Sequence, residues 1–454
     1  MAGLNASILG DDRTIAALAT PLGRGALAVV RVSGPNARTL ASTMLHPTPD
    51  IPRRATHCTV MDADGATVDD VIATLYVAPE SFTGEDMLEI STHGGLVAPM
   101  AVLSLAITSG ARQADPGEFT RRAVLNGKLD LLQAEAIGDL IDAKSTVAHR
   151  QALRQLDGGL SRRVEALRQQ VLSLEALLAY DIDFPEEDDG PIPRARIVST
   201  ATELLKAINL LLATGEKGML VHEGALVVLA GAPNVGKSSL FNALLGEARA
   251  IVTEIPGTTR DAIEAVLDLP GWPLRLVDTA GIRETQDVVE QLGIEASSRY
   301  LARAELVIAC VDSAESVEQV QRLRAYTDTP IVVVATKCDL RSSGDDIVAD
   351  LAVSAQTGQG LADLLHVIEH RLALSRGTPE LDAPGLTRTR HRVAVGRASE
   401  ELREFVRVWQ DDELPASVAA THVRMAAEAL SELIGAVHVE DVLDVVFRSF
   451  CVGK

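Results

Sequence analysis

Residues 231–238 read Gly-Ala-Pro-Asn-Val-Gly-Lys-Ser, and they lie between the apolar run Ala225 to Ala230 and a helical pattern that begins at Ser239. This order of strand, glycine-rich turn and helix, with the spacing G-x-x-x-x-G-K-S, is typical of a phosphate-binding loop. Small residues let consecutive backbone N–H groups surround the phosphates of a nucleotide at the positive end of a helix dipole. The pattern predicts that Lys237 contacts the β/γ oxygens and that Ser238 is a magnesium ligand.

Three further segments follow in an order that is typical of a Ras-like GTPase. Asp278-Thr-Ala-Gly281 comes after an apolar strand and offers an acid near magnesium and a glycine near the γ-phosphate. The apolar run 331–334 ends in Thr336-Lys337-Cys338-Asp339, and the run 347–353 ends in Ser354-Ala355. Gly257-Thr258-Thr259 is a switch motif, in which the Thr259 hydroxyl closes on magnesium while the γ-phosphate is present.

Asp339 predicts specificity for guanine. A carboxylate edge-on to the base accepts hydrogen bonds from N1–H and the 2-amino group, which adenine does not offer, and such pairing discriminates strongly. The alternative is that Asp339 only ends a strand before a turn. The usual motif has Asn where this chain has Thr336, a change that could loosen the loop. We therefore expect guanine preference with modest affinity.

Size, charge and cysteine usage narrow the class of protein. The 454 residues suffice for two to four domains, and 47% hydrophobic and 23% charged residues are typical of a globular protein. A net charge of -21 disfavours a protein that coats nucleic acid, so any RNA contact must be local or supplied by a partner. The four cysteines show no C-x-x-C pairing, which indicates neither a disulfide framework nor a zinc site. Without a long uninterrupted apolar run, we expect a cytoplasmic protein and no membrane contact.

The chain is predicted to be multidomain, with α/β and helical parts. Residues 1–128 alternate short strands, at 26–32, 71–77 and 87–90, with one helical stretch at 96–107, which indicates a small α+β domain. Residues 129–221 and 377–454 are helical, and a leucine stripe from Leu153 to Leu178 recurs at steps of three and four as the core face of a long helix, with a bend or break at Gly158-Gly159. The Ras-like P-loop GTPase domain, residues 222–376, is inserted between these two helical segments.

The chain closely resembles the tRNA-modification GTPase family MnmE, also called TrmE, over essentially its full length. The landmarks are blocks at both chain ends together with the GTPase motifs: Thr14-Ile-Ala-Ala17, Ala19-Thr-Pro21, Gly23-Arg-Gly25, Arg31-Val-Ser-Gly34, Ser81-Phe-Thr-Gly-Glu-Asp86, His93-Gly-Gly95, Pro116-Gly-Glu-Phe-Thr120, Asn126-Gly-Lys-Leu-Asp130, Ile182-Asp-Phe-Pro185 and Phe450-Cys-Val-Gly-Lys454.

The resemblance implies a homodimer that works with a flavin-containing partner, MnmG (GidA), in a heterotetramer or larger complex. The pair is implied to add a carboxymethylaminomethyl or aminomethyl group to C5 of the wobble uridine, position 34, of certain tRNAs. The one-carbon unit is implied to come from a tetrahydrofolate derivative, 5-formyl- or 5,10-methylene-tetrahydrofolate, bound by the N-terminal α+β domain, which also mediates dimerisation.

The family positions that hold the folate correspond to Arg31, Glu89, Lys128 and Lys454. A carboxylate such as Glu89 suits the amidine-like edge of a pterin, and the cations suit the anionic glutamate tail. Without the resemblance, ordinary surface charges would be the favoured interpretation of these residues. Cys451 belongs to the same C-terminal block as Lys454. The first interpretation is that Cys451 is structural or lines the site, and the second is that its thiol takes part in covalent catalysis.

The resemblance also implies how GTP is cleaved, since Ile282 follows Gly281 where Ras-like enzymes carry a water-positioning glutamine. Glu290 takes that role, with Glu284, Asp287 and Glu295 as alternatives. Asn234, with Thr253, Ile255 and Thr258, is implied to hold a potassium ion where an arginine finger would place its charge, whereas Arg260 and Arg283 are further candidates for charge stabilisation. The predicted magnesium ligands are Ser238 and Thr259. The full set of predicted GTP contacts is Asn234, Val235, Gly236, Lys237, Ser238, Ser239, Thr253, Glu254, Ile255, Pro256, Gly257, Thr258, Thr259, Asp278, Thr279, Ala280, Gly281, Thr336, Lys337, Asp339, Ser354 and Ala355.

Two other interpretations stay open at this point. An Era- or Der-like GTPase switch in ribosome assembly shares the Pro-Asn-x-Gly-Lys-Ser loop and the missing glutamine. Against it, the chain has no basic tail, and the N-terminal folate-type domain has no place there. The other interpretation is a regulatory switch whose partner alone performs the chemistry.

Overall fold

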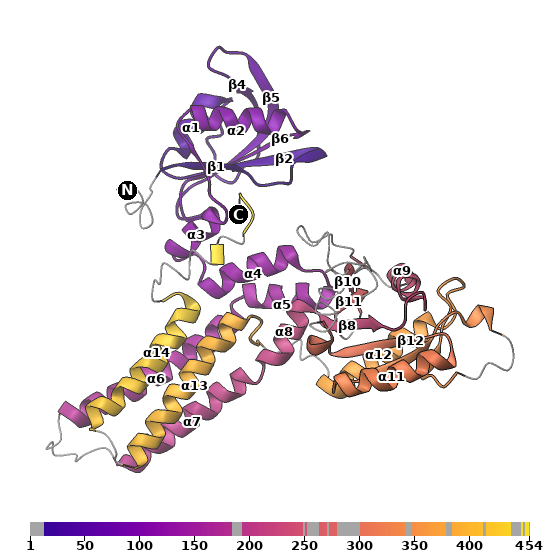
Figure 1. The fold of residues 1–454 in the computed structure, drawn as a ribbon. Coiled ribbons are helices and arrows are strands. Elements are labelled where there is room, and N and C mark those ends of the chain that lie inside the picture. Colours follow the sequence, from indigo (N-terminus) through magenta and orange to yellow (C-terminus); the bar gives the residue numbers. More distant parts are fainter. Residues whose placement is uncertain are drawn as a thin grey trace, which may run out of the picture. The chain divides into compact units, whose positions relative to one another are not determined.

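The computed structural model describes residues 13–183, 193–247, 250–251, 263–269, 272–278, 300–341, 347–377, 384–411, 415–436, 446–447 and 450–453 (Figure 1). The chain divides into two compact units, Met1–Gly138 with Ser431–Lys454, and Asp139–Leu430. Each unit is described by itself below.

The first unit contains a seven-stranded sheet covered by two helices. Alternation of buried and exposed residues along the second half of β2 turns one face of the sheet toward α1 and α2, with Val30, Val32 and Leu40 in the core between them. The predicted strands 26–32, 71–77 and 87–90 and the helix 96–107 are present, while β1, β4 and α1 were not predicted. The elements are, in sheet order, β3 (Leu45–His46), β4 (Thr56–Met61), β5 (Thr67–Tyr76), β6 (Met87–Gly95), β2 (Gly23–Ser33), β1 (Ile15–Leu18) and β7 (Arg112–Gln113), with α1 (Ala37–Met44) and α2 (Ala98–Thr108).

A network of buried charges explains two of the sequence landmarks of this unit. Arg122 on α3 (Glu118–Leu125) is 7% exposed and donates to both Glu85, at 3.0 and 3.1 Å, and Glu118, at 3.1 Å. Ser33 donates to Glu85 at 2.8 Å, and Arg112 pairs with Glu118. Buried arginine is stable only when paired and hydrogen-bonded, so Glu85 and Glu118 satisfy the buried guanidinium of Arg122.

The chain's C-terminal segment packs within the same unit. Phe447 and Phe450 join Val124 and Leu131 in a small apolar cluster, and their rings lie 5.3 Å apart. Val452 forms a β-bridge with Pro116. The segment that ends in Gly453 is thereby fixed to the sheet domain.

The helical part of the second unit carries the predicted leucine stripe as core from Leu160 to Leu178, whereas the first predicted member, Leu153, is 41% exposed. Along α6 the residues Leu160, Val164 and Leu174 are buried, and the predicted interruption is a break: α5 ends at Leu156, Gly158 has a φ of 78°, and α6 begins at Gly159. The helices are α4 (Leu131–Asp142), which crosses into this unit from the first, α5 (Thr146–Leu156), α6 (Gly159–Asp183), α7 (Arg194–Leu212), α8 (Gly215–Glu223), α13 (Thr389–Gln410) and α14 (Ala416–Ile434).

Within the described ranges, one stretch, Arg194–Glu223, is long and apolar enough to cross a membrane by length and composition alone. A core helix of a globular protein passes the same test, and α7 buries Ile197, Leu204 and Ile208 on a face that packs against α6 and α13.

The GTPase-like part of the second unit is a twisted sheet with β8 near its centre. The strand order is β14-β13-β12-β8-β11-β10-β9, in which β8 pairs in parallel with β11 on one side and β12 on the other. Ligands of such sheets bind outside the carboxyl ends of the strands, where the order reverses. The elements are β8 (Ala225–Ala230), β9 (Ala250–Ile251), β10 (Ile263–Leu267), β11 (Leu274–Asp278), β12 (Leu306–Val311), β13 (Ile331–Ala335) and β14 (Leu351–Ala352), with α9 (Lys237–Glu247), α11 (Ala314–Tyr326) and α12 (Leu361–Arg376).

Candidate functional site

The phosphate loop, residues 231–238, begins at the carboxyl end of β8, whose six residues are all buried. Gly231 has a φ of 145°, and a Cβ there would lie 2.5 Å from the carbonyl oxygen of Cys310, so only glycine fits. Lys237 begins α9 and is 6% exposed. Its Nζ donates to the carbonyls of Gly231 at 3.0 Å and Ala232 at 2.8 Å. The ammonium group is therefore held inside the loop.

The tip of the loop has a backbone that few residues tolerate. Asn234 has a φ of 61° and Gly236 a φ of 102°, both in the left-handed region that asparagine and glycine adopt most readily. Asn234 is exposed at the tip of the loop, and Ser238 and Ser239 are exposed at the start of α9. These side chains face solvent at the place where the sequence predicts phosphates and metal ions.

Asp278 ends β11 and is 1% exposed. Its register partner on β8 is Leu229, two residues before the phosphate loop. The pKa of the nearby Cys310 thiol depends on both charged groups. Burial raises this pKa to about 12, the Lys237 ammonium lowers it and the Asp278 carboxylate raises it. The predicted phosphate-binding lysine and the predicted magnesium-side acid thus lie close to the same buried strand end.

Thr336 joins the guanine loop, residues 336–339, to the phosphate loop. Its side chain is buried, and its hydroxyl donates to the carbonyl of Val235 in the phosphate loop at 2.5 Å. The carbonyl of Val311 lies 3.3 Å from the same hydroxyl, and Arg341 donates to the Thr336 carbonyl at 2.8 Å. The hydroxyl therefore ties the two loops, a role that sequence reasoning missed.

Lys337 makes a second tie between the two loops. Its Nζ donates to the carbonyl of Asn234 at 2.8 Å and pairs with Asp312 at 2.9 Å. The backbone of Lys337 has a φ of 54°, an uncommon conformation for a residue with a Cβ. The sequence gave no signal for Asp312, whose carboxylate orients the lysine.

Asp339 lies in the short helix η2 (Cys338–Leu340) and is exposed. The backbone N–H of Cys338 donates to the carbonyl of Val353 at 3.2 Å, which joins this turn to the next predicted segment. Ser354 is fully buried, and its Oγ accepts from the N–H of Thr357 at 3.2 Å. The three predicted segments that carry Lys237, Asp339 and Ser354 therefore meet at one edge of the sheet.

Several predicted site residues lie outside the described residues: Thr253, Glu254, Ile255, Pro256, Gly257, Thr258, Thr259, Thr279, Ala280, Gly281, Glu290 and Lys454, together with the alternatives Arg260, Arg283, Glu284, Asp287 and Glu295.

The first unit holds a second cluster, built across three strands. Arg31 and Glu89 are register partners on β2 and β6, and their side chains pair at 2.8 Å. Tyr76 on β5 donates to the other Glu89 oxygen at 3.3 Å, and the Arg31 guanidinium lies 5.8 Å from the centre of the Phe82 ring. Burial raises the pKa of Tyr76, and the Glu89 carboxylate adds to the rise. The resemblance predicted Arg31 and Glu89, whereas Tyr76 and Phe82 were missed.

Lys128 contacts the loop, residues 79–84, that carries Phe82. Its Nζ donates to the carbonyl of Pro79 at 3.0 Å, and its side chain lies against Gly84. The C-terminal segment approaches from β1: Gly453 packs against Leu18, the residue after the register partner of Arg31. Cys451 is exposed, and its carbonyl accepts from the N–H of Gly117 at 3.3 Å.

Comparisons with known proteins cover almost the whole chain. The family model of the GTP-binding protein TrmE N-terminus matches residues 14–128, and that of the MnmE helical domain matches residues 131–451. A tRNA modification GTPase MnmE from Moorella thermoacetica is 40% identical, over 98% of this chain and 100% of the relative. The same named protein from Aquifex aeolicus is 40% identical and that from Neisseria gonorrhoeae 41% identical, each over 97% of this chain and 99% of the relative.

Among solved structures, the G domain of the T. maritima FeoB iron transporter is 27% identical over 32% of this chain and 98% of that chain, with a TM-score of 0.25.

Proposed function

The chain belongs to the tRNA modification GTPase MnmE family and is a GTP hydrolase of tRNA modification, and from that premise we propose the finer chemistry of its two sites. The second unit hydrolyses GTP with Mg²⁺ in a potassium-activated reaction. The first unit binds a tetrahydrofolate one-carbon donor. Together with an FAD-containing MnmG partner, in the cytoplasm, the protein adds a carboxymethylaminomethyl or aminomethyl group to C5 of the wobble uridine, position 34, of tRNA.

The shape of the phosphate loop supports the potassium proposal. Lys337 donates a hydrogen bond to the backbone carbonyl of Asn234. The side chain of Asn234 is exposed at the tip of the loop. The amide side chain offers an oxygen, the donor that hard cations prefer. A monovalent cation there offsets the negative charge that develops between the β- and γ-phosphates, as an arginine finger does elsewhere. Thr253, Ile255 and Thr258 are proposed to complete its ligands, and Glu290 to orient the attacking water.

Magnesium fits the residues at the base of the loop. Ser238 provides an exposed hydroxyl at the start of α9, and Asp278 provides a buried carboxylate at the end of β11. Oxygen donors of this kind suit Mg²⁺, which is usually bound by few protein ligands together with the substrate's phosphates. Thr259 is proposed as the second hydroxyl ligand. Lys237, already inside the loop, is positioned to meet the β- and γ-phosphate oxygens.

The Arg31–Glu89 pair supports the folate proposal because it combines the two chemistries that a folate presents. The carboxylate of Glu89 can accept from the pterin's amidine-like edge, and Arg31 and Lys128 can meet the anionic glutamate tail. The Phe82 ring beside Arg31 offers a flat apolar surface for the pterin. Lys454 is proposed to join this site, because the residue before it packs against β1.

A homodimer is supported by exposed apolar residues at one end of the first unit's sheet. Leu27 is 68% exposed, Leu96 67% and Val97 81%. Leu27 is the register partner of His93 on β6, and Leu96 and Val97 follow directly after that strand. A group of exposed apolar side chains of this kind is typical of a protein–protein interface. We propose that a second copy of the chain covers it, and that the MnmG flavoprotein joins the dimer in a heterotetramer or larger complex.

The observation that carries the proposal is the presence of both sites in one chain: a tied phosphate loop and the Arg31–Glu89 cluster. Reconstitution from the two purified proteins, tRNA, GTP, a 5,10-methylene-tetrahydrofolate donor of the one-carbon unit, and glycine or ammonium as the source of the amine tests it. The modified nucleoside, measured by mass spectrometry, should appear only with every component present. Formation of the nucleoside at the same rate without the folate or without GTP would refute the proposal.

A further inference from the structure

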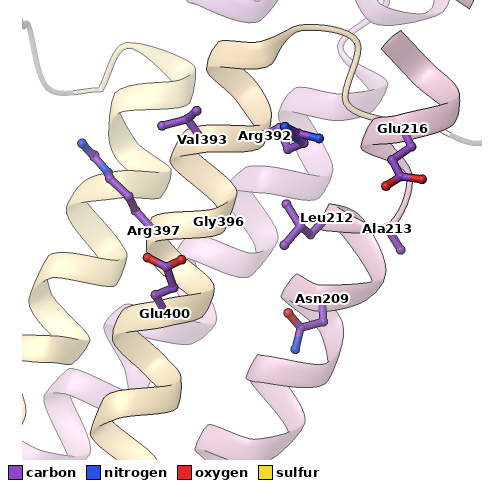
Figure 2. A pocket seen from close by; sticks show the side chains of 9 residues that line it. All are labelled: Asn209, Leu212, Ala213, Glu216, Arg392, Val393, Gly396, Arg397 and Glu400. Carbon is purple, nitrogen blue, oxygen red and sulfur yellow. The ribbon is translucent and has the colours of Figure 1, made fainter. Parts of the chain in front are cut away.

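A groove in the helical part of the second unit belongs to neither proposed site. It lies between α13 on one side and α7 and α8 on the other, with a volume of about 770 Å³ (Figure 2). Figure 2 shows Gly396 of α13 between the side chains of Arg392 and Arg397. A Cβ added at Gly396 would meet nothing within 4 Å, so the helix backbone is open to a ligand there. The lining residues are Asn209, Leu212, Ala213, Glu216, Arg392, Val393, Gly396, Arg397 and Glu400.

The α13 wall of the groove carries two arginines, Arg392 and Arg397, in a chain whose net charge is -21. Arg388, one helical turn before Arg392, pairs with Asp139 and does not line the groove. Two carboxylates, Glu216 of α8 and Glu400 of α13, line the groove as well.

The side-chain carbons of Arg392 lie 3.5 Å from a Cβ built at Gly215. Arg392 as a whole is exposed. Within the part of the chain that the structure describes, no hydrogen bond or ion pair engages the Arg392 guanidinium. A cation that is held by its stem and has no carboxylate partner is poised for an external anion.

We propose that this groove binds the phosphodiester backbone of the tRNA, with Arg392 and Arg397 contacting phosphates on either side of Gly396. This inference rests on the tRNA substrate of the proposed function. Arginine recognises phosphate through its planar fork of donors, and Gly396 lets the RNA backbone approach α13 closely. Val393, which is 55% exposed, offers apolar surface to a ribose.

The contact positions the tRNA and does not read its sequence. None of the lining residues is aromatic, so the groove lacks the stacking surface with which proteins read unpaired bases. Contacts to phosphate fix the register of a nucleic acid without sequence information. The exposed carboxylates of Glu216 and Glu400 both line the groove and work against the contact. Removal of the Glu400 carboxylate should therefore tighten binding.

The binding assay uses the full-length protein and a fluorescently labelled transcript of a bacterial tRNA, titrated at several salt concentrations. Arg392→Gln should weaken binding roughly five- to eightfold at ~0.1 M salt, the loss of one phosphate contact with a salt slope of about 0.7 to 0.9. The slope itself should fall by about 1. Arg392→Lys should keep most of the affinity, because a phosphate accepts a point charge. Arg407→Gln removes the same charge from an exposed position of the same helix, and it should change neither affinity nor slope.

Two further pairs of variants distinguish binding in the groove from a general effect of protein charge. Glu400→Gln should strengthen binding, whereas Glu404→Gln, one turn further along α13, should not. Gly396→Glu should block the groove, whereas Gly396→Ala should bind normally. GTP hydrolysis and its potassium dependence should stay unchanged in Arg392→Gln, so a failure of this inference is distinct from a failure of the proposed function.

The inference is overturned if Arg392→Gln and Gly396→Glu bind the transcript with unchanged affinity and salt slope. It is also overturned if these variants lose only their association with the flavoprotein partner, because the groove would then be a protein interface. A loss of tRNA affinity equal in Arg392→Gln and Arg407→Gln would contradict it too, since the effect would follow overall charge.

Discussion

The phosphate loop and the Arg31–Glu89 cluster are built in opposite ways. The phosphate loop is held by side chains that donate to its backbone: Lys237, Thr336 and Lys337 each bond a carbonyl of residues 231–235. The cluster on the first unit's sheet is held by side chains that bond one another across strands. In the first case the proposed binding surface is the backbone, and in the second it is the side chains.

This difference decides what a substitution does. If backbone groups bind the phosphates, as proposed, changing a side chain that ties the loop alters nucleotide affinity only through the loop's position. In the sheet cluster, under the folate proposal, the same atoms that hold the structure also contact the ligand. Removing one of them leaves its charged neighbour without a partner and deletes a ligand contact at once.

The largest expected effect breaks the sheet cluster. Glu89→Ala and Arg31→Ala should each lower the affinity for 5-formyl-tetrahydrofolate roughly 10- to 100-fold, since a hydrogen bond to a charged group contributes about 1.5–3 kcal/mol. Isothermal titration calorimetry measures this. Asp69→Asn is the matched control, because Asp69 pairs with the exposed His93 elsewhere on the same sheet. Unchanged affinity in both alanine variants would remove the cluster from folate binding.

A smaller effect is expected at the tie between the two GTP loops. Thr336→Val removes the hydroxyl that donates to Val235, and the affinities for GTP and GDP should fall about five- to tenfold, as for a buried hydrogen bond of about 1–1.5 kcal/mol. Thr336→Ser keeps the hydroxyl and should bind almost as well as the native protein. Stopped-flow titration with a fluorescent nucleotide measures both. If the valine variant binds like the native protein, the hydroxyl does not position the loop.

The contrast also explains what the sequence could predict. The phosphate loop, Asp278 and the guanine loop follow buried strands of one sheet, so spacing alone places them together. The pairing of Arg31 with Glu89 depends on the register of two antiparallel strands 58 residues apart, and no local pattern encodes it; only the family resemblance pointed there. Tyr76 and Phe82 were missed for the same reason. The strands β1 and β4 are short and weakly patterned, whereas the break at Gly158 was visible as a glycine pair.

The smallest expected effect is the pH dependence of stability that comes from Glu118 in the charge network with Arg112 and Arg122. Burial alone would raise the pKa of Glu118, but the hydrogen bonds from Arg112 and the Asp115 N–H outweigh it, and the pKa lies below its ordinary value of 4.5. The stability that Glu118 contributes is therefore fully present above pH 4.5 and is lost as the pH falls through the lowered pKa. Hydrogen exchange of β1 and β2 should quicken in that acidic range, and less steeply in Glu118→Gln. A variant with the same acid dependence as the native protein would contradict this assignment.

The most direct test of the account is the rate of GTP hydrolysis in potassium against sodium, for the native protein and for Asn234→Ala. The account predicts that sodium slows the native protein greatly and that Asn234→Ala is slow in both salts while it still binds GTP. Equal native rates in the two salts, or an Asn234→Ala variant that keeps its potassium activation, would contradict the central claim that the exposed tip of the phosphate loop holds the activating ion.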